Sequence, residues 1–397
     1  MMDDRIRPFA YRASDRELAE LRRRLRRTRW PDRETVGDWS QGVPLAFLQD
    51  LCAYWADGYD WRATEARLAR IPQFVTTIDG VDIQFLHVRS REPDATPIVL
   101  THGWPGSFFE FEAAIGALTD PVAHGGEAGD AFDVVVPSVP GYGFSGKPAT
   151  TGWGIHRIAD TWAELMARLG YRRFIAAGSD WGTSISTSLA LEHPDRMLGI
   201  HLVPPLAAPD RDAPDLTRAE RQALAELDER GATGSGYSAV HASRPQTIGY
   251  ALVDSPAGLA AWIVEKLWEW SDRDPDARSA LTRDRMLDDI TLYWLTGTAA
   301  SSARLYAESI AEVSAWFTTA NGPPVTVPTA ATVFPREVPR PSRRWAERRF
   351  TNIVHWGEPP HGGHFGAWEQ PDLFVAELRA GAAAIAAAHG APPSFAS

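Results

Sequence analysis

Three short segments of the sequence carry side chains that could do nucleophilic or acid–base chemistry. In residues 178–182, GSDWG, an aspartate stands between small residues where the buried apolar stretch FIAAG gives way to a helical pattern. This is the form of a sharp strand-to-helix turn that holds a nucleophile, here Asp180, exposed above a sheet. An ordinary helix N-cap would also favour aspartate at this place. Ser179 is a rival nucleophile, but the register disfavours it because Trp181 is not small.

A second segment, THGWPG at 101–106, follows the apolar stretch PIVL. A loop in this position can lend a backbone N–H to an oxyanion hole, together with the N–H that follows the nucleophile. The expected donors are therefore the N–H groups of Trp104 and Trp181. A plain glycine–proline turn is the alternative, but it explains neither the position after a buried strand nor the match with the aspartate turn.

The third segment, GGHF, places His364 after the last predicted strand, FTNIVHW at 350–356. A histidine there can activate a water molecule, because its ordinary pKa lies near neutrality. His361 is close enough in sequence to remain a lesser rival. His355 lies within the predicted strand, and we expect it to be a core or sheet-face residue.

The acid expected to orient this histidine follows the preceding predicted strand, VTVPTAATVF at 325–334. Glu337 is the candidate, although a solvated loop carboxylate would look the same in the sequence. The chain order is then Asp180, Glu337, His364. This is the order of nucleophile, acid and histidine expected of a hydrolytic triad on an α/β sheet.

Composition narrows the class of protein. The 397 residues are 44% hydrophobic and 23% charged, which is enough for a large core and about two domain-sized units. The net charge of −11 disfavours a nucleic-acid partner, and the basic run at 22–29 is expected on the solvent face of a helix. No stretch of 18 apolar residues and no secretory signal pattern is present, and the single cysteine excludes an internal disulfide. We therefore expect a cytoplasmic protein.

Periodicity divides the chain into four regions. Strand-like stretches alternate with amphipathic helices in the second and fourth regions, which predicts an α/β fold with a mostly parallel sheet flanked by helices. The first and third regions read as helical. The regions are an N-terminal arm (1–72), a first part of the core (73–206), a helical cap (207–320) and a second part of the core (321–397).

Local signals mark several elements within these regions. Ser14 with Glu17, and Thr217 with Glu220, have the spacing of capping boxes at helix starts. An Asp-Gly pair at 79–80 predicts a tight hairpin. The helix after the aspartate turn is expected to run from Thr183 towards Pro194.

Together these motifs resemble the microsomal-type epoxide hydrolases of the α/β-hydrolase superfamily, over nearly the whole chain. The likeness rests on the arm sequence RPFAYRASDRELAELRRRLRRTRWPD, on the core motifs HGWPGS, PGYGFSGKP, GSDWG and GGHFGAWEQP, and on the cap sequences DSPAGLAAWIVEKLWEW and YWLTGTAASSARLYAES. It implies the α/β-hydrolase fold, with the arm wrapped around the cap. Mammalian members carry an N-terminal membrane anchor, whereas this chain begins with the arm, which implies a soluble, bacterial-type relative without an anchor.

The resemblance also implies two cap tyrosines that hold the epoxide oxygen, which fall on Tyr237 and Tyr306. A phenol can hydrogen-bond this oxygen and give up its proton as negative charge develops. Tyr250 and Tyr293 are expected to be half-buried cap residues with their hydroxyls on water. The implied reaction converts an epoxide and water to a vicinal diol through an ester on Asp180, and it needs no cofactor and no metal. A small-molecule epoxide and water are the expected partners, and a homo-oligomer stays open.

Two other functions remain open from the sequence. A haloalkane dehalogenase would use the same Asp, Glu and His, and would hold halide with tryptophan N–H groups such as that of Trp181. The cap tyrosines would then be superfluous. A non-catalytic α/β-hydrolase relative that binds a small ligand would have no chemical need for all three triad residues.

Overall fold

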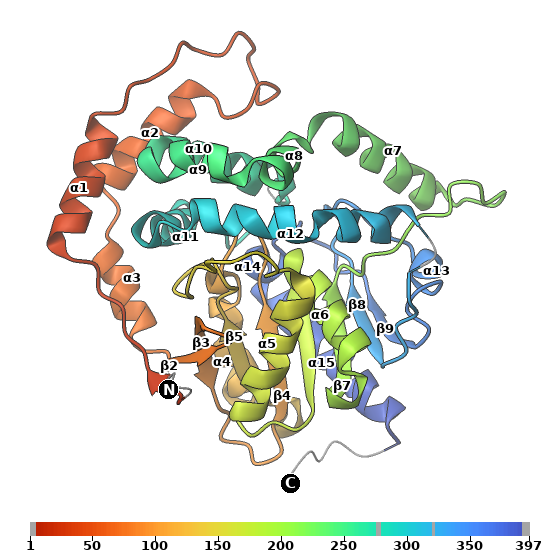
Figure 1. Ribbon diagram of the computed structural model, residues 1–397. Coiled ribbons are helices and arrows are strands. Elements are labelled where there is room, and N and C mark those ends of the chain that lie inside the picture. The colour runs from red at the N-terminus through yellow and green to blue at the C-terminus, as the bar shows by residue number, and fades with distance from the viewer. Residues whose placement is uncertain (1–4, 275–278, 320–321, 391–397) are drawn as a thin grey trace.

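A nine-stranded sheet runs through the molecule in the order β1-β2-β3-β5-β4-β6-β7-β8-β9. The computed structural model describes residues 5–274, 279–319 and 322–390 (Figure 1). The pairs β1–β2, β2–β3 and β3–β5 are antiparallel, and the pairs from β5–β4 onward to β8–β9 are parallel. The strands are Arg7–Pro8, Gln73–Ile78, Val81–Val88, Thr96–Thr101, Phe132–Pro137, Phe174–Ser179, Met197–Val203, Thr329–Thr332 and Ile353–Gly357, numbered β1 to β9.

Helices cover both faces of this sheet, which confirms the predicted α/β architecture. On one face α5 (Ile155–Arg168) packs against α6 (Trp181–Glu192), and α6 contacts the central strands (Figure 1). On the other face α15 (Pro371–Ala388) lies over β7 to β9 and beside α4 (Glu112–Thr119). The central parallel strands β4, β6 and β7 are fully buried between these two layers, as their continuous apolar sequences require.

A third layer of helices lies above the sheet (Figure 1). It consists of α7 (Arg218–Thr233), α8 (Gly236–Ser243), α9 (Pro245–Asp254), α10 (Pro256–Trp270), α11 (Arg283–Thr296) and α12 (Ala299–Thr318). In the described part of the chain no single helix has the length and apolar composition of a membrane span, and only α9 and α10 taken together, with a bend of 116°, would pass that test.

The hairpin at 79–80 and both capping boxes are confirmed, whereas three other elements differ from the prediction. Strand β8 covers only four residues of the predicted 325–334, because Pro328 interrupts the ladder and leaves Val325 in an isolated bridge. Strand β7 is not among the predicted strands, and α6 begins at Trp181 rather than Thr183.

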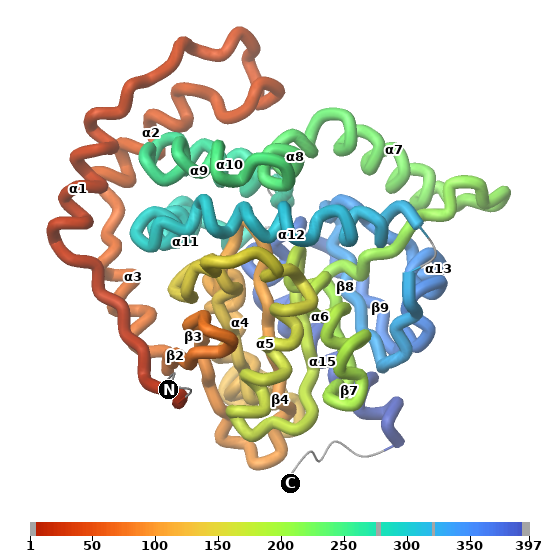
Figure 2. Tube along the Cα trace, in the orientation of Figure 1, coloured from red at the N-terminus to blue at the C-terminus, as the bar shows by residue number. Residues whose placement is uncertain are grey.

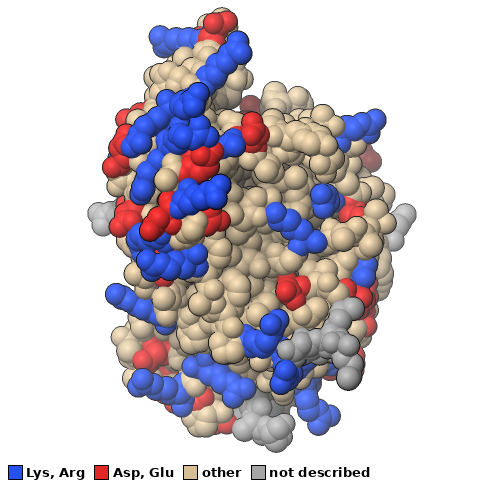
Figure 3. All heavy atoms as spheres, turned by 60° about the vertical axis from the view of Figure 1, so that its left-hand side comes forward, with Lys and Arg blue, Asp and Glu red and all other residues tan. Residues whose placement is uncertain are grey.

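The N-terminal helices α1 (Asp15–Arg26), α2 (Leu45–Asp57) and α3 (Trp61–Leu68) connect the sheet edge to the upper helical layer (Figure 2). Strand β1 pairs with β2, while α1 and α2 pack against α10. The leucines of α1 are buried. Its arginines are on the outer surface, where basic and acidic side chains mix (Figure 3) and Arg26 pairs with Asp57. A solvated basic face is therefore the correct interpretation of the run at 22–29.

A buried carboxylate on α11 holds the N-terminal helices in place. Asp288 accepts hydrogen bonds from the Tyr59 hydroxyl (2.6 Å) and the Thr64 hydroxyl (2.5 Å), and it pairs with Arg67 (2.6 Å). The indole N–H of Trp55 donates to Thr291 on the same helix (2.9 Å). These polar contacts cross an otherwise apolar interface, so their loss leaves buried donors without partners.

Replacing this carboxylate should loosen the arm. We expect Asp288→Ala to lower the free energy of unfolding by about 2–3 kcal/mol, since two buried hydroxyls and a guanidinium lose their acceptor. Asp284→Ala is the matched control on the same helix, because it removes one exposed hydrogen bond to Tyr54 and should cost well under 1 kcal/mol. Thermal and urea unfolding of both variants measures the difference. Equal losses would mean that the Asp288 cluster does not secure the arm.

Candidate active site

Asp180 sits at the turn between β6 and α6 with a backbone φ of +52°, a conformation that non-glycine residues rarely adopt. Its carboxylate makes no capping hydrogen bond to α6, so the helix-cap interpretation does not account for it. The backbone is crowded on both sides: a Cβ at Gly182 would overlap the Thr101 carbonyl, and a Cβ at Gly103 would overlap the Asp180 side chain. The small residues of the two motifs are therefore steric requirements of the turn.

The loop after β4 meets this aspartate as the motif predicts. The backbone N–H of Trp104 donates to Asp180 Oδ1 at 2.9 Å. Trp181 is the first residue of α6, where backbone N–H groups have no partner within the helix. The Asp180 carboxylate thus lies where at least one main-chain donor already stabilises negative charge on its oxygen.

His364 lies beside Asp180 and Glu337. Asp180 follows β6, whereas Glu337 and His364 follow the neighbouring strands β8 and β9. Its Nδ1 is 2.9 Å from Glu337 Oε1, and its Nε2 is 3.5 Å from Asp180 Oδ2. All three residues line one pocket. The histidine and the glutamate are buried, so their pairing is shielded from water.

The rival residues have other partners. The Ser179 hydroxyl donates to Glu110 at 3.2 Å. His355 lies on β9 and bonds Glu377 at 2.7 Å, as expected of a sheet-face residue. His361 lines a separate hollow and not the pocket of Asp180. The structure thus brings together the three residues that the sequence analysis favoured.

The charge around His364 sets its protonation. Burial alone would lower the pKa of this imidazole, but the Glu337 and Asp180 carboxylates outweigh burial and raise the pKa to about 10. The histidine is therefore protonated at neutral pH. If Asp180 lost its negative charge, one of the two interactions that raise the pKa of His364 would disappear.

The two tyrosines named by the resemblance lie together on the upper wall. The Tyr306 hydroxyl is 3.5 Å from the Tyr237 hydroxyl, and both residues line the pocket with Asp180. Burial raises the pKa of Tyr237 to about 12, although the charge of Arg230 opposes this. Burial also raises the pKa of Tyr306 well above its ordinary value. Both phenols are therefore neutral donors at physiological pH.

Aromatic rings fix the position of these tyrosines. Tyr237 stacks on Trp104 with ring centroids 5.0 Å apart, and Trp181 packs edge-on against Tyr306 at 4.8 Å. His241 fills the remaining side, 4.9 Å from the ring of Tyr306. Trp104 and Trp181, whose backbone N–H groups lie at the Asp180 turn, thus also pack against the two tyrosines. These ring contacts connect the upper wall of the pocket to the turn below it.

Tyr250 and Tyr293 depart from the expectation of half-buried residues with hydroxyls on water. Tyr250 is 72% exposed on α9. Tyr293 is fully buried, and its hydroxyl donates to the carbonyl of Gly106 at 3.0 Å. The sequence offered no signal for this contact, because the two residues come from different layers of the fold. Tyr293 supports the loop that carries Trp104.

Glu110 is another residue that the sequence analysis missed. It is buried behind the same loop, where a Cβ on Gly106 would overlap its carboxyl group, and it accepts the Ser179 hydrogen bond. Burial raises the pKa of Glu110 to about 8, with the Asp180 charge adding to the effect and His364 opposing it. A neutral carboxyl group therefore links the loop after β4 to the turn that carries Asp180.

The pocket has a volume of about 340 Å³ and lies between the sheet edge and the helices α7, α8 and α12. Its floor carries Asp180 and His364. Its walls are mostly apolar, and α12 contributes Ile310, Val313 and Phe317. A cavity of this size suits a small, largely apolar molecule with one polar centre.

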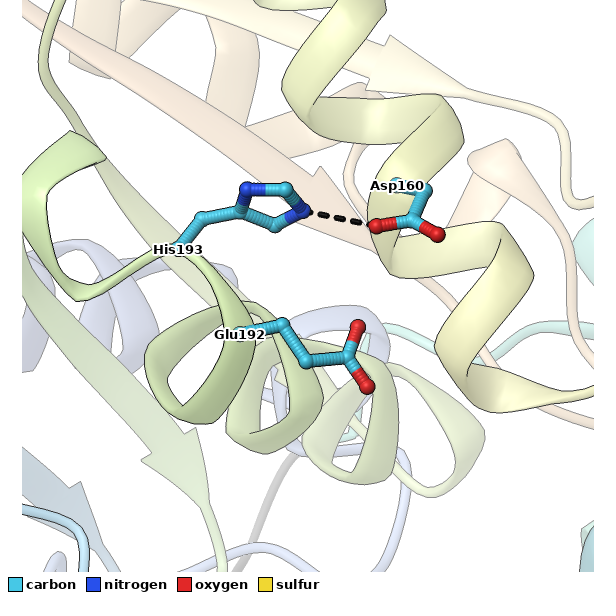
Figure 4. A group of neighbouring side chains, drawn as sticks. All are labelled: Asp160, Glu192 and His193. Atoms are coloured by element: carbon cyan, nitrogen blue, oxygen red, sulfur yellow. Dashed lines mark hydrogen bonds and ion pairs between the residues drawn. The ribbon is translucent and has the colours of Figure 1, made fainter.

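One group of potential metal ligands lies elsewhere on the surface (Figure 4). Asp160 on α5 approaches Glu192 and His193 at the end of α6, and His193 bonds Asp160 at 2.7 Å. Glu192 is already paired with His156. The group lies a whole helix length, about 18 Å, from Asp180. No chemistry is assigned to it, since exposed acidic groups like these commonly occur without an ion.

The crowding at the turn can be tested by adding one methyl group. Gly182→Ala should destabilise the fold by about 3 kcal/mol and displace Asp180, because the new Cβ meets the backbone of β4. Gly231→Ala is the control, since its Cβ would meet nothing within 4 Å in α7 and should be neutral or stabilising. Differential scanning calorimetry measures both. A fully stable Gly182→Ala protein would contradict the steric argument.

Comparisons with known proteins agree with this geometry. The family model described as "Epoxide hydrolase N terminus" matches residues 6–111, and that described as "alpha/beta hydrolase fold" matches 96–234. A protein of Stigmatella aurantiaca (strain DW4/3-1) named "Putative epoxide hydrolase" is 52% identical over 94% of this chain and 84% of its own length. Epoxide hydrolase 1 of Sus scrofa is 33% identical over 95% of this chain and 88% of its own.

Solved structures show the same relationship. The crystal structure of juvenile hormone epoxide hydrolase from the silkworm Bombyx mori matches with a TM-score of 0.87 and 28% identity, over 98% of this chain and 96% of that chain. The Aspergillus niger epoxide hydrolase matches with a TM-score of 0.85 and 30% identity, over 96% of each chain. The predicted α/β-hydrolase fold is confirmed, and the chain belongs to the microsomal-type epoxide hydrolase family.

Proposed function

We propose that this enzyme opens an epoxide through a covalent ester on Asp180 and then hydrolyses the ester to a vicinal diol. The observation that carries the proposal is one pocket in which Asp180 faces His364 below and two neutral phenols above. A phenol can stabilise the oxygen that an opening epoxide releases. A carboxylate on a strained turn is placed to attack the adjacent carbon.

In the first half-reaction, Asp180 forms a bond to one epoxide carbon while the carbon–oxygen bond of the ring breaks. The released oxygen takes a proton from Tyr237 or Tyr306, which leaves a 2-hydroxyalkyl ester and a phenolate. The ester is neutral, so His364 loses a charge that raised its pKa. The His364 proton then moves to the phenolate, and the imidazole becomes a base.

In the second half-reaction, neutral His364 takes a proton from water, held in orientation by Glu337. The hydroxide attacks the ester carbon of Asp180, and the N–H groups of Trp104 and Trp181 stabilise the resulting oxyanion. The intermediate expels the diol oxygen, which takes the proton of the tetrahedral hydroxyl. Asp180 regains its carboxylate, and His364 remains protonated as at the start.

The ester intermediate can be trapped. With styrene oxide, His364→Gln should alkylate Asp180 but fail to hydrolyse the ester, so mass spectrometry should find an adduct on the peptide that contains Asp180. His361→Gln is the matched control and should turn over normally. Glu337→Gln should slow ester hydrolysis less completely, since the imidazole remains. Normal steady turnover by His364→Gln would remove this histidine from the mechanism.

Isotope labelling tests the covalent step directly. In a single turnover in heavy-oxygen water, the first diol should carry unlabelled oxygen from the enzyme, and the label should enter the Asp180 carboxylate. The reason is that the new diol oxygen comes from Asp180, which water then replenishes. A first diol that takes all its new oxygen from water would establish direct hydration instead.

The tyrosines distinguish epoxide opening from dehalogenation. Replacing Tyr237 or Tyr306 with Phe should slow alkylation of Asp180 by an epoxide roughly 100- to 1000-fold, because one donor to the developing alkoxide is lost. Ester hydrolysis should change little. Tyr250→Phe, on the exposed face of α9, is the control and should leave the rate of Asp180 alkylation unchanged. Stopped-flow tryptophan fluorescence follows alkylation, and unchanged rates in both pocket variants would favour halide displacement, which needs no proton.

A further inference from the structure

Arg230, near the end of α7, places a guanidinium on the pocket wall beside Tyr237. Its Nη1 donates to the Val338 carbonyl at 2.6 Å, and its guanidinium lies 4.7 Å from the ring centroid of Trp270. The Trp270 ring is in turn 5.3 Å from the ring of Tyr237. These contacts fix the cation close to the phenol that would hold the epoxide oxygen.

This cation has no carboxylate partner among residues 5–274, 279–319 and 322–390. Glu226, one helical turn before it on α7, pairs instead with Arg340 at 3.0 Å. The acidic residues of the neighbouring elements also have other cationic partners. Glu269 pairs with Lys266 at 2.7 Å, and Glu337 pairs with His364 at 2.9 Å. No acidic side chain in the described ranges therefore neutralises the charge of Arg230, and its guanidinium lines the pocket beside the Tyr237 hydroxyl, with which it shares a hydrogen bond.

A cation at the edge of an apolar cavity loses part of its hydration. The free energy lost in this way is compensated only when an anion binds beside the cation. Guanidinium groups match carboxylates in geometry, because two parallel N–H donors reach two oxygens. Asp180 and Glu337 line the same pocket, and two acidic residues disfavour a doubly charged group such as a phosphate monoester. A single carboxylate is thus the anion that this wall suits.

We propose that Arg230 binds a carboxylate borne by the substrate close to its epoxide ring, so that the enzyme acts preferentially on epoxy acids. The apolar body of such a substrate would lie along Ile310, Val313 and Phe317 of α12. The inference rests on the proposed function, because it assumes that the epoxide oxygen is held by Tyr237. It assigns a role in substrate selection to a residue outside the reacting groups.

A pair of neutral and charged isosteres tests the inference. Wild-type enzyme should turn over 3-phenylglycidate with a kcat/KM about 10- to 100-fold above that for 3-phenylglycidamide, the usual range for a hydrogen-bonded charge. Arg230→Gln should abolish most of this preference, mainly by raising KM for the acid. The acid and the amide differ in the intrinsic reactivity of their epoxide rings. This difference cancels when the ratio of kcat/KM for the acid to kcat/KM for the amide is compared between wild-type and Arg230→Gln enzyme. Arg218→Gln, which removes the same charge from the exposed start of α7, should keep the wild-type ratio.

Two results would overturn the inference. One is a wild-type preference for the amide. The other is an equal loss on acid and amide in Arg230→Gln, which would mean that Arg230 acts on Tyr237 and not on the substrate. Failure of the proposed function is distinct, because it would show as no styrene oxide turnover and no adduct on Asp180.

A measurement on the wild-type enzyme covers the case in which the variant does not fold. Inhibition of styrene oxide turnover by 3-phenylpropionate should be at least about tenfold stronger than inhibition by 3-phenylpropionamide, and it should weaken as salt is added. Equal inhibition by the two compounds would overturn the inference without any substitution.

Discussion

The reaction centre depends on the close approach of two backbone segments, the loop after β4 and the turn after β6. Gly103 and Gly182 are the points of contact, and neither site has room for a Cβ atom. This contact strains the backbone of Asp180 into a positive φ and brings its carboxylate against the Trp104 N–H. Strain of this kind, typically 1–3 kcal/mol, persists only where the surroundings fix it. Here Tyr293 and the buried Glu110 supply the fixing contacts from behind the loop.

Local sequence patterns were sufficient to predict the floor of the site. The glycine-flanked aspartate, the loop after β4 and the histidine after the last strand each follow a strand end, and parallel strands bring their carboxyl ends to one edge. Asp180, Glu337 and His364 could therefore be assigned to one place before the fold was known. The tyrosines of the upper wall came from family resemblance instead, since nothing in local periodicity distinguishes Tyr306 from Tyr293.

What the sequence did not predict are contacts between layers. The hydrogen bond from Tyr293 to Gly106, the buried Glu110 and the arm contacts of Asp288 all join segments far apart in the chain. Such pairings depend on how helices pack on the sheet, which hydrophobic spacing alone leaves open. Strand β7 was missed for a related reason: a short apolar run is ambiguous until its neighbours are placed.

Strands β7 and β8 are neighbours in the sheet, although all of α7 to α12 separates them in the chain. Bringing Leu202 beside Ala331 therefore closes a very long loop, and the entropy of that closure must be offset by contacts formed within the inserted helices. We expect these helices to become compact before the last two parallel strands join the sheet, because long-range parallel pairing is intrinsically slow. Glu337 and His364 follow those two strands, so we expect both side chains to reach Asp180 only late in folding.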